Sequence, residues 1–374
     1  MINFSILKKL RNPIIIFGSV RDYHAVDWYL NLYKINQNTI FVSDCNCGEG
    51  IENQMPTNHS YIQLIPLDNL LLGSQSRLAN IWRNTLKILI LPINSILFLS
   101  ICIILKPKII HAHPLYYGLI CKILNQKYIV TPQGSEILVR ARNNKLYKLL
   151  AGFILKGAKH ITTDSILMKK TINNFYKLDS FVVQNGIDSS NILKIKENKP
   201  IYKDEYLLSF RSIHANYRIL EILKTRNYSS PEIPIYFVYP SFDNDYFNEV
   251  KRYLKPFDRL LGKVEKKRLF SLMANSIATI SIPISDSSPK SVYESIFSGA
   301  PTILQENPYQ DNMTDSMKSR VISFATRDIE KSNWLRDSIK KAKYISKEYS
   351  PCKSSYEKFD SEFILNTINP KFYV

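Results

Sequence analysis

Two acidic residues, Asp286 and Glu294, flank a serine-rich stretch and have seven residues between them. The apolar run Ile277–Ile284 predicts a buried strand, and Ser288, followed by proline, predicts the start of a helix. Free backbone N–H groups at a helix start favour an anion, typically a phosphate. Lys290 in the first turn opposes the helix dipole, which a bound anion would explain. The pattern predicts a phosphate site where two acids hold the ends of a nucleotide-linked molecule. The alternative is a solvated helix start that these acids merely cap.

The first half of the chain places further polar residues after predicted strands. His111 and His113 end one strand, and the sequence Gly134-Ser135-Glu136 follows the next. Ligands of open α/β sheets bind beyond the carboxyl ends of the strands, so we expect His113 and this loop to gather there. We expect the two histidines to face opposite sides of their strand, one in the core and one in a cleft. On that expectation they do not chelate one metal together.

Three cofactor motifs find little support. Gly18 is the sole glycine of the first strand–helix turn, so a GxGxxG dinucleotide fingerprint is absent and a dehydrogenase is disfavoured. Asp243 and Asp245 could hold a divalent metal under a diphosphate, but the alternative is a polar loop without a ligand. Cys45 and Cys47 lack a second ligand pair nearby, so we do not expect zinc.

The chain is globular, strongly basic and long enough for two domains. It has 374 residues, 45% of them hydrophobic, with 50 Lys and Arg against 32 Asp and Glu, for a net charge of +18. The basic residues form small dispersed groups, which favours an anionic membrane or phosphorylated substrates over nucleic acid. A compositional bias is the plainer alternative. Five scattered cysteines and no secretory signal predict a cytoplasmic location.

Buried strands alternate with helices along the chain, which predicts an α/β fold with parallel sheets. The expected strands are Ile14–Phe17, Thr39–Ser43, Lys108–His111, Tyr128–Thr131, Ala158–Ser165, Phe181–Gln184, Tyr206–Phe210, Ile235–Tyr239 and Ile277–Ile284. The polar stretch Asn191–Asp204 is interpreted as a linker near the domain boundary. The most apolar run, Ile88–Leu105, is interpreted as a helix that covers the sheet; a helix lying on a bilayer and a membrane span are the alternatives.

Seven segments in this order resemble the family 4 glycosyltransferases of GT-B fold. They are HAHP, TPQGSEIL, ITTDSILMKK, VVQNGID, LLSFRSI, GKVEKKRLFSLMANS and SDSSPKSVYESIFSGAPTI. The resemblance implies two Rossmann-like domains that face each other across a cleft. Residues 1–188 would form the acceptor side and 189–345 would bind the nucleotide-sugar, while 346–374 would cross back to the first domain. It also implies retaining transfer from a UDP- or GDP-linked donor, without a metal or other cofactor.

The resemblance also suggests roles for individual residues. Asp286 and Glu294 match the family's acid pair, in which Glu294 would bind the ribose hydroxyls and Asp286 those of the donor sugar. Arg211 matches the arginine that neutralises the diphosphate, and His113 the cleft histidine near the reacting carbon. We therefore predict that His113, Arg211 and Asp286 are catalytic. The predicted substrate-binding residues are Gly18, Gly134, Ser135, Glu136, Arg218, Ser287, Ser288, Lys290, Ser291 and Glu294.

Two departures from the family pattern concern the phosphate contacts. Asp286 is one methylene shorter than the usual glutamate. The lysine expected six residues after Arg211 is replaced by Tyr217, so Arg218 or Lys290 would supply the second positive charge.

The favoured interpretation is a cytoplasmic hexosyltransferase, peripheral on the inner face of the plasma membrane. It would extend a surface polysaccharide or a lipid-linked oligosaccharide, as in lipopolysaccharide or capsule synthesis. Contact with an anionic membrane is expected, and nucleic acid is not an expected partner. The alternatives are a nucleotide-sugar epimerase of the same fold and a noncatalytic scaffold of a polysaccharide assembly complex.

Overall fold

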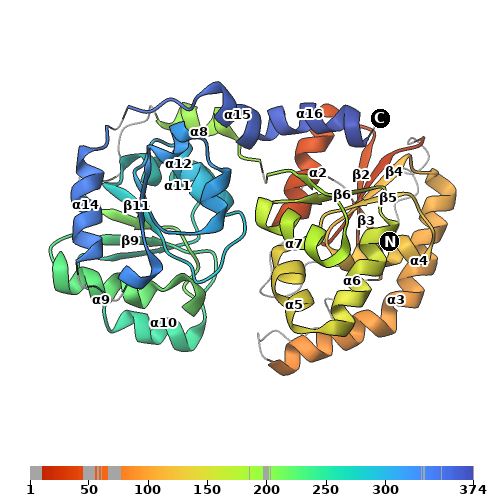
Figure 1. Ribbon diagram of the computed structural model, residues 1–374, viewed down its shortest axis with the longest axis horizontal. Coiled ribbons are helices and arrows are strands. Elements are labelled where there is room, and N and C mark those ends of the chain that lie inside the picture. Colours follow the sequence, from red (N-terminus) through yellow and green to blue (C-terminus); the bar gives the residue numbers. More distant parts are fainter. Residues whose placement is uncertain are drawn as a thin grey trace. The chain divides into compact units, whose positions relative to one another are not determined.

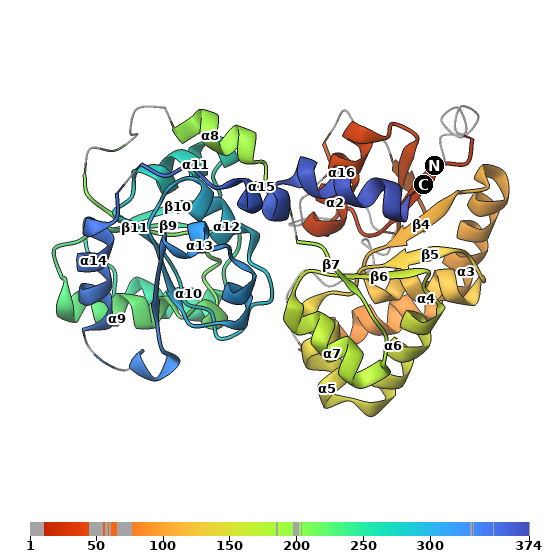
Figure 2. The same ribbon diagram turned by 45° about the horizontal axis from the view of Figure 1, so that its top comes forward.

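The computed structural model divides into two compact units. Unit 1 comprises Met1–Val183 and Leu365–Val374, and unit 2 comprises Gln184–Ile364. The described residues are 11–44, 55–56, 59, 61–65, 77–184, 186–196, 202, 204–329, 331, 333–346 and 348–373. Each unit is a parallel sheet covered by helices, which confirms the predicted fold class (Figures 1 and 2). Cys45 and Cys47 lie outside the described residues.

Among the described residues, unit 1 holds a seven-stranded parallel sheet in the order β3-β2-β1-β4-β5-β6-β7. The strands are β1 (Ile14–Phe17), β2 (Thr39–Ser43), β3 (Tyr61–Gln63), β4 (Ile109–Ala112), β5 (Tyr128–Val130), β6 (His160–Thr163) and β7 (Phe181–Val182). The helices are α2 (Tyr23–Ile35), α3 (Arg77–Leu105), α4 (Leu115–Ile123), a π-helical segment (Ser135–Arg140), α5 (Ala141–Asn143), α6 (Lys145–Gly157), α7 (Ile166–Tyr176) and α16 (Ser361–Phe372), which begins in unit 2.

Both faces of the unit 1 sheet are covered. Ile15 and Phe17 of β1 belong to a core built with α3, α4, α6 and α7 on one face. Helices α2 and α16 lie on the opposite face (Figures 1 and 2). Successive strand residues point to opposite faces, so strands buried on both faces are apolar throughout, as β1 is.

Helix α3 covers the sheet, as predicted, and is apolar on two faces. Phe98 and Leu105 are buried in the unit 1 core, whereas Ile88, Ile96 and Ile103 are exposed. Its 21-residue part Thr85–Leu105 is the one helical stretch in the described residues that is long and apolar enough to cross a membrane. A helix packed on a sheet meets the same criterion, so this length and composition alone leave the span an open alternative.

Unit 2 holds a six-stranded parallel sheet, within the described residues, in the order β10-β9-β8-β11-β12-β13. The strands are β8 (Leu207–Ser209), β9 (Ile235–Val238), β10 (Arg259–Gly262), β11 (Ala278–Ser281), β12 (Thr302–Gln305) and β13 (Val321–Phe324). The α-helices are α8 (Ser189–Lys196), α9 (Ile219–Ser229), α10 (Asn244–Lys251), α11 (Lys266–Asn275), α12 (Lys290–Phe297), α13 (Asp315–Lys318), α14 (Trp334–Tyr344) and α15 (Lys353–Phe359). Short 3-10 turns are Ala215–Tyr217, Pro308–Asn312 and Thr326–Asp328.

Helices also cover both faces of the unit 2 sheet. Helices α8, α11 and α12 contribute to one core, and α9, α10 and α14 to the other (Figure 1). The prediction of a linker at Asn191–Asp204 is wrong at its start, because α8 runs to Lys196. Ile192 and Ile195 are buried in the core there, and their apolar contacts hold a helix in a stretch of polar composition.

Candidate functional site

In unit 2, three predicted residues meet where β8 and β11 end side by side. Arg211 lies two positions after β8, and Asp286 lies in the loop between β11 and α12. The Arg211 guanidinium is ion-paired with Asp286 through Nη2, and its Nη1 donates to Ser291 Oγ at 3.0 Å. The structure thus brings Arg211, Asp286 and Ser291 into direct contact at the amino end of α12.

The neighbours of Arg211 hold its guanidinium group in one position. The Tyr217 ring centroid lies 4.8 Å from the guanidinium carbon, so Tyr217 stacks on the arginine. The Arg211 Nε is buried and has no hydrogen-bond acceptor among the described residues. A buried donor of this kind is costly unless a ligand supplies an acceptor. Together with the positive end of the α12 dipole, this cation can bind an anion.

The helix start itself differs by one residue from the prediction. Pro289, with φ −76° and ψ 97°, occupies the N-cap position, and Lys290 begins the helix. Ser288 does not cap it, because its buried hydroxyl donates to Gln184 Oε1 at 2.6 Å. The backbone N–H of Ser287 donates to Asp286 Oδ1 at 3.0 Å. The serine-rich stretch is therefore held as a defined loop.

Glu294 lies in the second turn of α12 and is almost wholly buried. Its Oε1 accepts from Lys266 Nζ at 2.6 Å. Arg218 is held elsewhere, because its Nη1 donates to Gln305 Oε1 at the carboxyl end of β12. Lys290 is half-buried in the first turn of α12. Lys290 directly precedes Ser291, the hydroxyl partner of Arg211, whereas Arg218 is bonded to Gln305.

In unit 1, the prediction that the two histidines face opposite sides of their strand is wrong. The rings of His111 and His113 are 4.2 Å apart, and both are buried. The physical reason is the two-residue period of a strand, which sends positions i and i+2 to the same face. Both rings pack against Trp28 of α2, at 4.9 and 5.3 Å.

His111 belongs to a buried chain of hydrogen bonds. Trp28 Nε1 donates to the hydroxyl of Tyr373 at 2.8 Å, and this hydroxyl also shares a hydrogen bond with Nδ1 of His111. The other ring nitrogen of His111, Nε2, shares a hydrogen bond with Thr131 Oγ1 at 2.7 Å. Thr131 in turn bonds to Thr162. Burial lowers the pKa of His111 well below its ordinary value, which keeps the ring neutral.

His113 is the histidine with a vacant nitrogen. Burial, reinforced by His24, lowers the pKa of His113 to about 3, so the ring is neutral at physiological pH. Its Nε2 is buried and has no hydrogen-bond partner among the described residues. Gly18 lies close by, because a Cβ at this position would come within 3.1 Å of the His113 carbonyl oxygen and 2.9 Å of Ala25 Cβ. Gly18 therefore allows the close approach of β1, α2 and the end of β4.

The Gly134-Ser135-Glu136 segment begins a π-helical turn, which the sequence did not indicate. Glu136 is buried, and its Oε2 accepts from the backbone N–H groups of Gln133 at 2.9 Å and Leu115 at 3.2 Å. Its Oε1 accepts from the Tyr147 hydroxyl at 3.1 Å. Burial raises the pKa of Glu136 despite these bonds. The carboxyl group thus joins the β5 loop to the amino end of α4.

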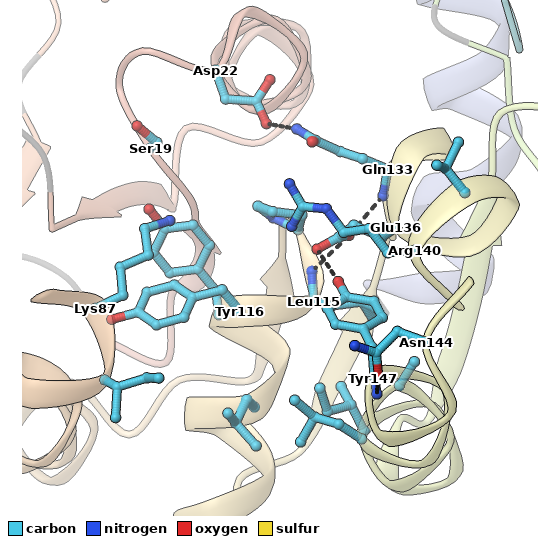
Figure 3. A pocket seen from close by; sticks show the side chains of 18 of the residues that line it. Ser19, Asp22, Lys87, Leu115, Tyr116, Gln133, Glu136, Arg140, Asn144 and Tyr147 are labelled. Atoms are coloured by element: carbon cyan, nitrogen blue, oxygen red, sulfur yellow. Dashed lines mark hydrogen bonds between the residues drawn. The ribbon is translucent and has the colours of Figure 1, made fainter. Parts of the chain in front are cut away.

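A cavity of about 1160 Å³ opens at this edge of unit 1 (Figure 3). Its walls come from α3, α4, α6 and the loops that follow β1, β4 and β5. The polar residues around it include Ser19, Asp22, Gln133, Glu136 and Arg140. Asp22 accepts from Gln133 Nε2 at 2.9 Å across the cavity edge (Figure 3). The carboxyl ends of parallel strands are where such folds bind ligands.

Metal-binding residues do not gather in the part of the chain that the structure describes. Groups of three or more His, Cys, Asp or Glu that could hold a metal ion are absent there. Asp243, half of the Asp-x-Asp motif, is the N-cap of α10 and accepts from the Tyr246 backbone N–H at 3.0 Å.

Comparison with known proteins identifies the fold. No family model and no curated protein matches this chain. Sucrose-phosphate synthase (tll1590) from Thermosynechococcus elongatus is 12% identical with a TM-score of 0.72, over 97% of this chain and 98% of that one. Anabaena Alr3699/HepE, solved with UDP and glucose, is 13% identical with a TM-score of 0.62, over 96% and 99%. The α,α-trehalose-phosphate synthase (UDP-forming) from Burkholderia vietnamiensis is 10% identical with a TM-score of 0.67, over 97% of each chain. The fold is GT-B.

At these identities the likeness establishes the GT-B fold alone, and membership of family 4 stays a prediction.

The sequence did not indicate several side chains that hold the predicted residues in place. Lys266 pairs with Glu294, Tyr217 stacks on Arg211, and Trp28 and Tyr373 support the histidines. Lys266 lies in GKVEKKRLFSLMANS, one of the seven segments that carry the resemblance, and this position was the one sequence feature that pointed to it. Tyr373 lies far along the chain from its partners, so sequence spacing could not reveal it.

Proposed function

We propose that this GT-B protein is a metal-independent hexosyltransferase that uses a UDP- or GDP-linked sugar. The sugar would pass with retention of configuration to a surface polysaccharide or a lipid-linked oligosaccharide, as in lipopolysaccharide or capsule synthesis. A cytoplasmic location, peripheral on the inner face of the plasma membrane, would suit this acceptor. Structures of similar fold contain UDP, UDP and glucose, or UDP-glucose, which supports the nucleotide-sugar part of the proposal.

The arrangement of Arg211 is the observation that carries the proposal. A departing nucleoside diphosphate gains negative charge as the glycosidic bond breaks. Arg211, already fixed by Asp286 and Ser291, and the N–H groups at the start of α12 would stabilise that charge most in the transition state. Lys290 in the first turn would add a second positive charge. Groups fixed in advance lose little free energy to reorganisation during the reaction.

Other residues would divide the remaining tasks. Glu294 would bind the ribose and Asp286 the donor sugar. His113, neutral and with a vacant buried Nε2, would contact a sugar hydroxyl near the reacting carbon. A neutral imidazole can accept or donate one hydrogen bond there without adding charge.

Calorimetric titration with UDP, GDP and their hexose derivatives tests this proposal. We expect one nucleotide series to bind, and Arg211→Ala to lower both affinity and turnover, turnover by about 10²–10³-fold. The control is Arg259→Ala, a partly exposed arginine of the same unit on the edge strand β10. Equal binding by both variants would refute the role of Arg211. Release of a free epimerised sugar nucleotide would favour the epimerase, and absence of nucleotide binding would favour the scaffold.

A further inference from the structure

The cavity of unit 1 is open at a rim of exposed aliphatic side chains. Ile88 of α3, Val139 of the π-helical segment and Leu150 of α6 all line the cavity, yet Ile88 is 72% exposed and the other two are also exposed. Three separate elements thus present apolar side chains to water around one opening. Exposed apolar groups that gather at one place mark an interaction site more often than scattered ones do.

The apolar rim continues along α6 as a stripe. Leu146, Leu149, Leu150 and Phe153 follow helical spacing and are all exposed, Leu146 by 76% and Leu149 by 72%. Residues at i, i+3, i+4 and i+7 share one face of a helix, so this face is apolar and faces solvent. The opposite face of α6 packs in the core of unit 1.

Positive charge surrounds this stripe. The segment 140–156 contains five basic residues and no acidic one, and they are Arg140, Arg142, Lys145, Lys148 and Lys156. Lys87 of α3 lies at the cavity with its ammonium 4.6 Å from the Tyr116 ring centroid (Figure 3). The residues that line the cavity include three cations, Arg21, Lys87 and Arg140, and two acids, Asp22 and Glu136. Glu136 interacts with the Arg140 charge, and burial nevertheless raises the pKa of its carboxyl group. The charge of the lining is therefore positive on balance.

From this combination, we propose that the cavity binds the phosphate-bearing headgroup of a long-chain lipid drawn from an anionic bilayer. The lipid chain runs over the rim formed by Ile88, Val139 and Leu150, and its phosphate lies near Lys87 and Arg140. The stripe on α6 enters the bilayer surface while the flanking basic residues contact anionic headgroups. A water-soluble oligosaccharide would leave the stripe exposed to water. This inference rests on the proposed function, because it names the carrier of the acceptor.

Vesicle flotation tests the bilayer contact. We expect the wild-type chain to float with vesicles of phosphatidylcholine and phosphatidylglycerol, and more weakly with phosphatidylcholine alone. The double variant Leu146→Gln/Leu149→Gln loses two inserted side chains, so its partition coefficient should fall at least about tenfold. The control is Tyr228→Gln/Tyr344→Gln, which removes exposed apolar side chains of unit 2 and should float like wild type. Equal flotation of the two double variants would overturn the proposed surface.

Calorimetry with a soluble amphiphile tests the cavity. We expect dodecyl phosphate to bind, and inorganic phosphate and dodecyl maltoside to bind at least about tenfold more weakly, since each supplies half of the recognition. Arg140→Gln should lose dodecyl phosphate binding. Arg142→Gln, which changes the net charge equally at a residue outside the cavity lining, should retain it. Equal loss in both variants, or equal binding of inorganic phosphate, would overturn the site.

A UDP titration of the same proteins separates this inference from the proposed function. If UDP binds but vesicles and dodecyl phosphate do not, the lipid site is wrong and the transferase proposal stands. If vesicles and dodecyl phosphate bind but no nucleotide does, the lipid site stands on its own and the transferase proposal fails.

Discussion

The indole Nε1 of Trp28 lies 2.8 Å from the hydroxyl oxygen of Tyr373, which is 345 positions further along the chain. An indole N–H can only donate, so Tyr373 accepts this bond, and its hydroxyl is also hydrogen-bonded to His111. His111 is in turn packed against His113, the candidate catalytic histidine. Tyr373 therefore helps to position the two histidines at the carboxyl end of β4. Nothing in the sequence near β4 indicates this contact.

Replacing Tyr373 by phenylalanine would remove the hydroxyl that joins these groups. In Tyr373→Phe, Trp28 Nε1 and His111 Nδ1 would lose their partner in a buried site. We expect the free energy of unfolding to fall by about 1–3 kcal/mol, measured by urea denaturation. The control is Tyr344→Phe, whose residue is 90% exposed and should leave the midpoint unchanged. The same midpoint for both variants would mean that the network contributes nothing to stability.

The buried histidines should make stability depend on pH. The pKa of His113 is lowered to about 3 and that of His111 is lowered well below 6.5. In the unfolded chain both titrate near 6.5, so below this pH the unfolded state binds more protons and is favoured. Their contribution is complete above pH 6.5 and is lost as the pH falls below this value. For His113 the loss is roughly 1.4 kcal/mol per pH unit as the pH falls towards 3.

Urea denaturation at pH 7 and pH 5 measures this effect. We expect His113→Asn, which cannot titrate in this range, to lose less stability than wild type between the two pH values. The difference should be about 2 kcal/mol, the share of one ring over 1.5 units. Parallel pH profiles for the two proteins would show that folding does not lower the pKa of His113.

The close packing around Gly18, a predicted substrate-binding residue, can be tested by substitution. Gly18→Ala would bring a Cβ within 2.9 Å of Ala25 Cβ, so we expect it to lower the free energy of unfolding by about 1–3 kcal/mol. Adding Ala25→Gly removes the opposing methyl group. We expect this second change to cost less in the Gly18→Ala background than in wild type. Additive costs, measured by urea denaturation, would exclude the clash.

Local apolar patterns predicted nine of the strands, because burial on both faces requires runs such as Ile14–Phe17. The sequence did not indicate the strands β3, β10, β12 and β13. Local patterns failed where long-range packing decides the structure. Ile192 and Ile195 turn a polar stretch into a helix by reaching the core of unit 2. The π-helical turn at Ser135–Arg140 also has no distinct residue pattern, and it is fixed by the bonds of Glu136 to α4 and α6.

In the candidate site, too, the positions of residues could be predicted from the sequence, whereas their long-range contacts could not. The strand–loop–helix pattern pointed to Asp286, and the resemblance to family 4 pointed to Arg211. The structure brings both residues together with Ser291, because the parallel strands β8 and β11 end at one edge of the sheet. Side-chain pairing was not predictable, since Lys266 and Glu294 come from different helices. The prediction that His111 and His113 face opposite sides was wrong because it misapplied the two-residue period of a strand. The sequence itself contained the information needed to place them on one face.

The pair of Lys266 and Glu294 can be tested by a double-mutant cycle. Glu294 is 3% exposed and its carboxylate lies 2.6 Å from the Lys266 ammonium, which is 47% exposed. Lys266→Met leaves a buried carboxylate with weaker compensation, so we expect the free energy of unfolding to fall by about 1–2 kcal/mol, discounted for the exposure of the lysine. Lys267→Met, at the exposed neighbouring position, is the control and should have little effect.

The second half of the cycle separates the ion pair from nucleotide binding. We expect Glu294→Gln to recover most of the stability lost in Lys266→Met, because a neutral amide does not need the cation. In UDP titrations, Glu294→Gln should weaken binding by on the order of tenfold with or without Lys266, because hydrogen bonds to a charged group are worth about 1.5–3 kcal/mol. UDP affinity that follows Lys266 and ignores Glu294 would mean that the carboxylate orders α11 and α12 and does not hold the ribose.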